Sequence, residues 1–284
     1  FELGYISAPQ TAYEGIYSLP PASILEWSSQ GLEVYQYWNP VFQENLNYSE
    51  SQWKDQVKLK IEEAVKIRLI SERPIGSFLS GGIDSSIVSA VMQQHSANQI
   101  QTFTIGFEDA RFDESHWARE ISRVIGSNHN ELIVKPDPVV LLNTIANTFD
   151  QPFADSSAIP TFLVSQLASR NVVAILSGDG GDEIFGGYDR YRYSQKLRRS
   201  IYFNSILSKF MKIPIPMGGL DSKFQSIKRI LLNSNSRESI YRNFMTLYSN
   251  DDLNLLLNDN IFQSSFMNTG GSKFEVDWKM IAGN

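Results

Sequence analysis

The chain has 284 residues, of which 42% are hydrophobic and 20% charged, with a formal net charge of −6 and a pI near 5.2. This composition is ordinary for a globular protein, and the acidic balance argues against a nucleic-acid-binding surface. Cysteine is absent, which excludes disulfides, zinc–thiolate sites and cysteine nucleophiles and agrees with a cytoplasmic protein. No apolar run approaches the roughly 20 residues needed to cross a bilayer, so we expect no membrane segment.

Residues 1–52 are rich in Tyr, Trp and Pro and show no clean period. Disordered segments are poor in aromatic residues, so an extended linker segment that packs on a following domain is expected here. The next segment, residues 53–71, is predicted to be a helix because apolar residues recur at helical spacing: Val57, Ile61, Val65 and Leu69.

The string SGGIDSS, from Ser80 to Ser86, follows an apolar stretch and predicts a buried strand, a Gly-Gly turn and a helix. The apolar face of that helix is predicted to be Ile87, Val88 and Val91. A glycine pair at such a turn lets the backbone approach a ligand and point several N–H groups at one spot. The helix N-terminus and the serine hydroxyls add further donors, so the geometry suits a polyphosphate. The common G-x-x-x-x-G-K-[ST] pattern is absent.

Strands and helices alternate in the following hundred residues. Further strands are predicted at 101–107, 131–134 and 172–176. Helices are predicted at 113–125, 138–149 and 159–169, the first with Trp117, Ile121, Val124 and Ile125 on one face and Gly126 as its C-terminal cap. The alternation predicts an α/β fold with a parallel sheet of about five strands, which binds ligands beyond the carboxyl ends of the strands. Residues 226–232 and 240–248 are predicted to be helical.

A second glycine-rich string, SGDGGDE, runs from Ser177 to Glu183 directly after the last predicted strand. Its carboxylates, Asp179, Asp182 and Glu183, are expected to crowd one turn, and a cation would relieve their mutual repulsion. Mg²⁺ prefers a few carboxylates together with phosphate oxygens, and Asp84 could contribute from the first string. The alternative is an acidic turn that caps a helix.

These strings carry a resemblance to a known family. SGGxDS resembles the PP-loop of the ATP pyrophosphatases, which split ATP into AMP and pyrophosphate. The chain as a whole resembles the synthetase domain of glutamine-dependent asparagine synthetases through five strings in order: FLSGGIDSS, FTIGF, FDESHWARE, DQPFADSSAIP and LSGDGGDEIFGGY. TAYEGIYSLPPASIL and YQYWNP resemble the segment that joins this domain to the family's N-terminal glutaminase domain. The similarity covers about residues 1–195.

The resemblance implies a fold and a domain organisation. The expected fold is the α/β PP-loop type (adenine nucleotide alpha hydrolase-like, HUP-type) with a C-terminal helical region. Its parts would be a linker segment at 1–52, an ATP-binding synthetase core at 53–197 and a helical continuation at 198–284. The chain looks like a fragment, and a glutaminase domain is expected in the parent protein. Without cysteine this chain lacks the nucleophile by which that domain releases ammonia, and no K-x-D-R-like motif follows Tyr188.

The resemblance also implies the site residues, one by one. Phosphate contacts would come from Ser80, Gly81, Gly82, Asp84, Ser85 and Ser86. Adenosine contacts would come from Leu79, Ile105, Ser177 and Gly178. Asp84 and Asp182 would bind Mg²⁺, and Asp179, at a position that is often Glu in the family, would assist adenylate formation and the use of ammonia. The acceptor would meet Asp155, Ser156, Ser157 and Tyr188, with helix capping and aromatic packing as the alternative roles of these residues.

The implied activity is that of a ligase that uses ATP and Mg²⁺. A carboxylate, most directly that of aspartate, would be activated as an acyl-adenylate and then converted by ammonia into an amide. Two alternatives stay open: a related amidotransferase that acts on a sugar carboxylate or closes a β-lactam ring, and a fragment that binds nucleotide without turnover. The pocket side chains decide the acceptor, so the fold does not. The oligomeric state is also open, with a homodimer among the options.

Overall fold

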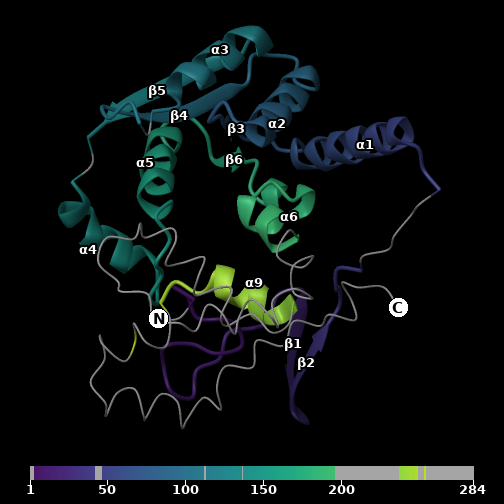
Figure 1. The fold of residues 1–284 in the computed structure, drawn as a ribbon, viewed down its shortest axis with the longest axis vertical. Helices are drawn as coiled ribbons and strands as arrows, with labels where there is room; N and C mark the ends of the chain where they lie inside the picture. Colours follow the sequence, from purple (N-terminus) through teal and green to yellow (C-terminus); the bar gives the residue numbers. More distant parts are fainter. Residues whose placement is uncertain are drawn as a thin grey trace, which may run out of the picture. The chain divides into compact units, whose positions relative to one another are not determined.

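The structure, a computed structural model, describes residues 3–41, 47–111, 113–135, 137–195, 237–248 and Leu253. The chain forms two compact units (Figure 1). The sheet unit consists of residues 44–150 and 155–185, and the terminal unit consists of residues 1–43, 151–154 and 186–284. The three-part division expected from the sequence remains a prediction.

A parallel sheet of four strands forms the centre of the sheet unit, in the order β5-β4-β3-β6. The strands are β3 (Ile75–Phe78), β4 (Gln101–Phe107), β5 (Asn128–Val134) and β6 (Ala174–Leu176). β4 is a central strand covered on both faces, which explains why neighbouring Thr102 and Phe103 are both fully buried. The predicted parallel α/β fold is confirmed, although the described residues form four strands of this sheet where about five were expected.

Helices connect the strands as the alternation predicted. They are α1 (Glu50–Arg68), α2 (Ile83–Gln94), α3 (Ser115–Ile125), α4 (Pro138–Thr148), α5 (Ala158–Ala168) and the short α6 (Gly181–Phe185). α1 begins with a capping box between Ser49 and Gln52, and α3 ends at Gly126 with φ +75°. None of the helices within the described ranges is long and apolar enough to cross a membrane.

Two apolar clusters cover the two faces of the sheet, since the odd spacing of Ile75 and Phe78 along β3 turns them to opposite sides. Ile75 packs with Val65 of α1 and Met92 of α2. Phe78 packs with Phe103, in a cluster that includes Ala168 at the end of α5. α3 and α5 lie on opposite faces of β4 and β5 (Figure 1). Helices therefore cover both faces of the sheet, and the edges at which the strands begin and end are the places where a ligand could reach it.

The predicted apolar face of α2 is confirmed in part. Val88 and Val91 pack against the cluster of Val65, Met92 and Ile100, whereas Ile87 is 40% exposed. The buried residues of the helix are Ser85, Ser89 and Met92. The Ser89 hydroxyl shares a 2.8 Å hydrogen bond with the buried Ser77 hydroxyl of β3. Small polar side chains thus let α2 approach the strand that leads into the glycine turn.

In α3, too, the predicted face is confirmed only in part, since Ile121 and Ile125 are half-buried. Its buried residues are Ser115, Ala118 and Ser122, which recur at helical spacing. Trp117 and Val124, which were predicted to face the core, are 59% and 83% exposed. Close approach of the helix to the sheet thus decides which face is buried, and hydrophobicity alone does not.

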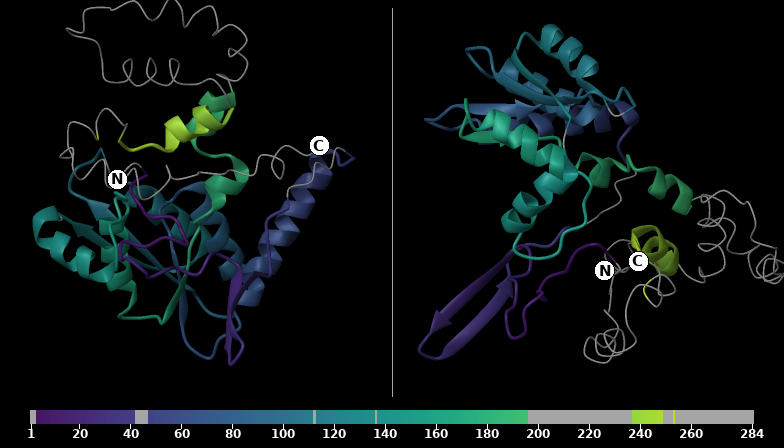
Figure 2. Two further views of the ribbon diagram at one scale, coloured as in Figure 1. Left: turned by 90° about the horizontal axis from the view of Figure 1, so that it is seen from below. Right: turned by 90° about the vertical axis from the view of Figure 1, so that its left-hand side faces the viewer.

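The terminal unit contains an antiparallel hairpin of β1 (Ser23–Ser28) and β2 (Gly31–Gln36), purple in Figures 1 and 2. The sequence reasoning expected only an extended segment here and missed this hairpin. In the same unit, the Ala154 N–H donates to the Gly4 carbonyl at 2.7 Å. α9 (Arg237–Met245) confirms a helix in the predicted 240–248 segment, while the helix predicted at 226–232 lies outside the described residues.

Candidate active site

The SGGIDSS string lies at the carboxyl end of β3. Leu79 extends the strand ladder, because its N–H donates to the Phe103 carbonyl at 3.0 Å. The whole residue is 1% exposed, so Leu79 is packed into the core directly beneath the turn. The chain then turns at Gly81, with φ +85°, and α2 begins with Gly82 as its N-cap. The predicted strand–turn–helix is confirmed.

Two serines hold the shape of this turn. The Ser80 N–H donates to the Ser85 hydroxyl at 3.2 Å, and the Gly82 N–H donates to the Ser80 hydroxyl at 3.2 Å. The two hydroxyls share a 3.0 Å bond, and the Ser85 hydroxyl also donates to the Gly82 carbonyl at 3.2 Å. Ser80 and Ser85 are therefore used in large part to fix the loop backbone.

Donors remain at the start of α2. Gly82 has no side chain with which to cap the helix, so no side-chain acceptor from the N-cap meets the N–H groups of the first turn. The Ser86 hydroxyl is buried and has no hydrogen-bond partner within the described part of the chain. A buried donor without a partner costs free energy unless a ligand or water satisfies it. Phosphate oxygens fit such a set of donors at a helix N-terminus.

The SGDGGDE string lies directly against this turn. A Cβ on Gly178 would stand 2.7 Å from the Ser85 nitrogen and 2.9 Å from the Asp84 Cβ. A Cβ on Gly181 would stand 2.5 Å from the Asp84 Cγ. Gly178 therefore requires glycine because backbone atoms occupy the Cβ position, whereas a side chain at Gly181 would displace the Asp84 carboxylate. The two strings meet at Asp84, at the same edge of the sheet, as the sequence predicted.

The carboxylates of the SGDGGDE string do not form the expected cluster. Asp182 is half-buried and Asp179 is exposed, with one Asp179 oxygen accepting the Ser177 hydroxyl at 2.9 Å. No three Asp, Glu or His side chains in the described ranges come together to hold a metal ion. The turn of α6 separates neighbouring side chains such as Asp182 and Glu183, which explains the difference. Mg²⁺ bound here would need phosphate oxygens or water in addition to carboxylates such as Asp84.

The remaining sheet-unit candidates lie at other places. Ile105 is half-buried in β4, opposite Leu132 of β5. Asp155, Ser156 and Ser157 are exposed before α5, where the Asp155 carboxylate accepts the Ser157 N–H at 2.8 Å. Ser157 is the N-cap residue of α5 but its side chain forms no capping hydrogen bond, and the contacts that join the two glycine strings do not include these three residues.

Tyr188 belongs to the terminal unit. The Arg190 guanidinium carbon lies 3.9 Å from the centre of the Tyr188 ring, and the Tyr191 ring lies 5.7 Å from it. These are contacts within one short segment, so the role of Tyr188 in packing between the sheet and the helical region and its contact with an acceptor both remain predictions.

The sequence reasoning missed a third contributor to the loop, the start of α3. A Cβ on Gly81 would stand 2.5 Å from the Trp117 Cβ and 2.7 Å from the Ala118 nitrogen. The small residues Ser115, Ala118 and Ser122, spaced at three and four positions, were the sequence signal for this close packing.

The fold is a parallel α/β sheet with two glycine strings that meet at its carboxyl edge, and sequence comparison gives the family. The family model described as asparagine synthase matches residues 56–250, and the chain belongs to this family of carbon–nitrogen ligases. A Methanocaldococcus jannaschii protein that carries an asparagine synthetase designation is 35% identical over 192 residues, which are 66% of this chain and 37% of that protein.

The chain is also similar to a bacterial asparagine synthetase and to a solved NAD synthetase. The glutamine-hydrolysing asparagine synthetase 1 of Bacillus subtilis is 38% identical over 144 residues, or 50% of this chain and 23% of that protein. The chain thus spans well under half the length of these relatives. A solved NH3-dependent NAD synthetase from Campylobacter jejuni matches 75% of this chain and 92% of its own, with 12% identity and a TM-score of 0.34.

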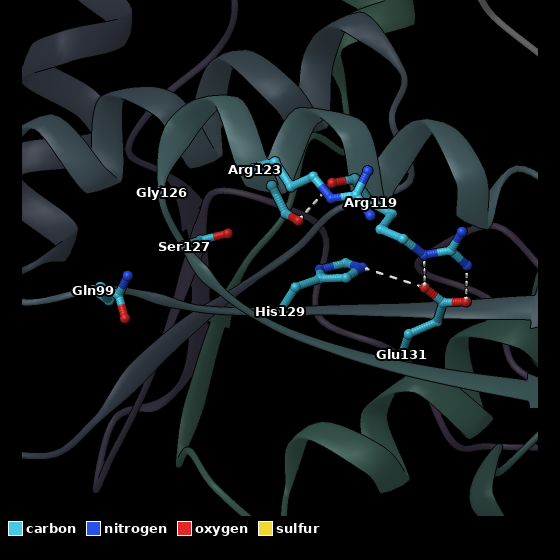
Figure 3. A pocket seen from close by; sticks show the side chains of 8 residues that line it. Gln99, Arg119, Arg123, Gly126, Ser127, His129 and Glu131 are labelled. Atoms are coloured by element: carbon cyan, nitrogen blue, oxygen red, sulfur yellow. Dashed lines mark hydrogen bonds and ion pairs between the residues drawn. The ribbon is translucent and has the colours of Figure 1, made fainter.

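A hollow of about 530 Å³ lies away from the two glycine strings, between α3 and the start of β5 (Figure 3). Gln99 and Ser127 line it just before β4 and β5 begin, so it is at the amino edge of the sheet. Within it, the His129 Nδ1 lies 3.0 Å from the Thr102 hydroxyl, and its Nε2 lies 4.0 Å from Glu131. Burial lowers the pKa of His129 by more than the nearby Glu131 carboxylate raises it.

Replacing Gly81 by alanine tests the close approach at the loop. Gly81→Ala combines the cost of a positive φ, about 1–2 kcal/mol, with a clash against α3, so we expect ATP affinity to fall at least about tenfold. Gly126→Ala is the matched control, because Gly126 has φ +75° but open space around its Cβ position. Calorimetric titration with ATP measures both variants. A folded Gly81→Ala protein with unchanged ATP affinity would contradict the packing described.

The pKa of His129 predicts how stability depends on pH. Its folded pKa lies below the ordinary value of 6.5, so the unfolded chain binds the proton first as the pH falls. Stability should therefore decrease as the pH drops below about 6.5, down to the folded pKa. His129→Gln should flatten this decrease in thermal melts, whereas His116→Gln, at an exposed position, serves as control. An unchanged slope in His129→Gln would refute the prediction.

Proposed function

We propose that this chain activates a carboxylate with ATP and converts it into an amide, most directly aspartate into asparagine. Membership of the asparagine synthase family supports ATP-dependent amide synthesis in general. The observation that carries the proposal is the meeting of two glycine strings around Asp84, where each glycine removes a side chain that would block the approach. A loop of backbone donors beside a carboxylate suits a nucleotide polyphosphate with its metal ion.

The proposed division of roles follows the geometry. The first turn of α2 and the Ser86 hydroxyl would hold the phosphates, while Ser80 and Ser85 keep the loop in shape. The backbone of Leu79 and Gly178 would meet the adenosine. Asp84, with Asp182, would hold Mg²⁺, which supplies charge neutralisation to the departing pyrophosphate.

The proposed reaction has two steps. An oxygen of the substrate carboxylate attacks the α-phosphorus of ATP, the bond to the β-phosphate oxygen breaks, and pyrophosphate leaves. Ammonia then attacks the acyl carbon, loses a proton, and expels AMP to give the amide. Donors fixed before the reaction stabilise the charge that develops at the phosphates. Asp179, exposed at the second string, is proposed to act in adenylate formation and in the use of ammonia.

Two alternatives to the proposed amidation of aspartate remain, and each differs from it in one respect. A sugar carboxylate or another acid would leave the nucleotide chemistry unchanged and alter only the acceptor. A nucleotide-binding fragment would hold ATP without turnover. In the parent protein a glutaminase domain is proposed to supply the ammonia, as the names of the glutamine-hydrolysing relatives suggest.

ATP–pyrophosphate exchange tests the proposal. The chain is incubated with ATP, Mg²⁺ and labelled pyrophosphate, and aspartate is compared with a panel of other carboxylic acids, including sugar acids. Exchange that depends on aspartate is the expected result, and Asp179→Ala should abolish it while sparing ATP binding. Exchange with another acid alone would favour the first alternative. ATP binding without any exchange would favour the second and contradict the proposed activity.

The metal role of Asp84 gives a separate prediction. Asp84→Asn keeps the shape that Gly178 and Gly181 accommodate but removes the charge, so we expect MgATP affinity to fall about tenfold with an unchanged circular dichroism spectrum. In the presence of EDTA, the wild-type and variant proteins should bind ATP with similar affinity. A tenfold difference that persists in EDTA would show that Asp84 does not act through the metal.

A further inference from the structure

We propose that Asp113 is a positioning residue for the nucleotide loop, acting through the start of α3. Asp113 lies in FDESHWARE, between the end of β4 and α3. The inference deepens the proposed function and rests on it, because it names a residue that controls ATP binding at the same site.

Asp113 joins the end of β4 to the beginning of α3. Its Oδ1 accepts the Phe107 N–H at 3.3 Å and the Ser115 N–H at 3.2 Å, and its Oδ2 accepts the Ser115 hydroxyl at 3.2 Å. Phe107 is the last residue of β4, and Ser115 is the first of α3 and fully buried. A Cβ on Gly106 would stand 2.8 Å from the Asp113 Oδ1, so the strand end carries a glycine where the carboxylate packs.

The carboxyl group of Asp113 is ionised more readily than an ordinary aspartate. Burial opposes ionisation, but the hydrogen bonds from Ser115 and Phe107 outweigh it, and the pKa lies below its usual value. The side chain of the neighbouring Glu114, the N-cap residue of α3, forms no capping hydrogen bond. Asp113 therefore serves as the side-chain anchor of the first turn of this helix.

The first turn of α3 in turn supports the nucleotide loop. Trp117 and Ala118 follow Ser115 within one helical turn, and their backbone and Cβ atoms lie where a side chain on Gly81 would have to be. Ala118 is completely buried, which leaves no space to absorb a shift. Movement of this turn by a fraction of an ångström would change the surface on which Gly81 rests, and with it the direction of the loop N–H groups.

A second attachment keeps the rest of α3 in place. One turn further along, Arg119 binds both oxygens of Glu131 in β5, at 2.6 and 3.1 Å (Figure 3). Loss of the Asp113 anchor should therefore loosen the first turn and leave the remainder of the helix attached. Asp113 variants are expected to fold, and their defect should appear in ATP binding.

The test compares matched variants by calorimetric titration with MgATP, well below the melting temperature of each protein. Asp113→Ala should weaken ATP binding about tenfold. Asp113→Asn keeps the Oδ1 acceptor and should stay within about threefold of the wild type, because Asn is as good a capping residue as Asp. Asp109→Ala is the control, since the Asp109 carboxylate is exposed and pairs with Arg111. In the exchange assay, Asp113→Ala should raise KM for ATP while kcat at saturating ATP changes little.

The outcomes separate the inference from the proposed function. Wild-type ATP affinity in folded Asp113→Ala contradicts the inference alone, as does an Asn variant as weak as the Ala variant. If Asp113→Ala does not fold, Ser115→Ala is tested in its place, because this variant removes the hydrogen bond from the Ser115 hydroxyl to Asp113. ATP binding about threefold weaker than in the wild type supports the inference, and unchanged ATP binding contradicts the inference. A wild-type chain that does not bind ATP contradicts the proposed function and, with it, this inference.

Discussion

The close approach of two glycine strings at the carboxyl edge of the sheet is the constraint on which the site depends. A side chain on Gly178 would overlap the backbone of Asp84 and Ser85, and a side chain on Gly181 would displace the Asp84 carboxylate. Because β6 pairs directly with β3, both strings leave neighbouring strands at the same edge. The site therefore follows from strand order combined with the absence of side chains at a few positions.

The same constraint explains the surroundings of the site. α2 and α3 turn serine and alanine toward the sheet, since larger residues would hold the helices too far from the loop. Ser80 and Ser85 then fix the loop backbone. Within the described part of the chain, the first turn of α2 has no side-chain cap and the Ser86 hydroxyl has no hydrogen-bond partner. A preorganised set of donors of this kind binds developing negative charge without further rearrangement. Asp113 and α3 extend this support to the back of the loop.

The sequence predicted the framework better than the packing. β4 was predicted with its observed bounds because Thr and Phe alternate along it, as is typical of a strand. β5 begins three residues earlier than predicted, since Asn128, His129 and Asn130 are polar and their tertiary hydrogen bonds are invisible in the sequence. The apolar faces assigned to α2 and α3 were right only in part. Val88 and Val91 pack against the core, whereas Ile87, Trp117 and Val124 are exposed, and small residues are the most deeply buried ones. The two glycine strings identified the candidate site, whereas the contact of Gly81 with Trp117 depends on tertiary structure.

Cleavage of ATP at the α-phosphate, between the two strings, is the central claim, and oxygen labelling tests it most directly. Aspartate with ¹⁸O in its side-chain carboxyl group is incubated with the chain, MgATP and ammonium, and the nucleotide product is analysed by mass spectrometry. Transfer of one ¹⁸O atom from the acid to AMP is the predicted result, because the acyl-adenylate shares that oxygen with the phosphate. Formation of ADP, with the label in inorganic phosphate, would contradict the account.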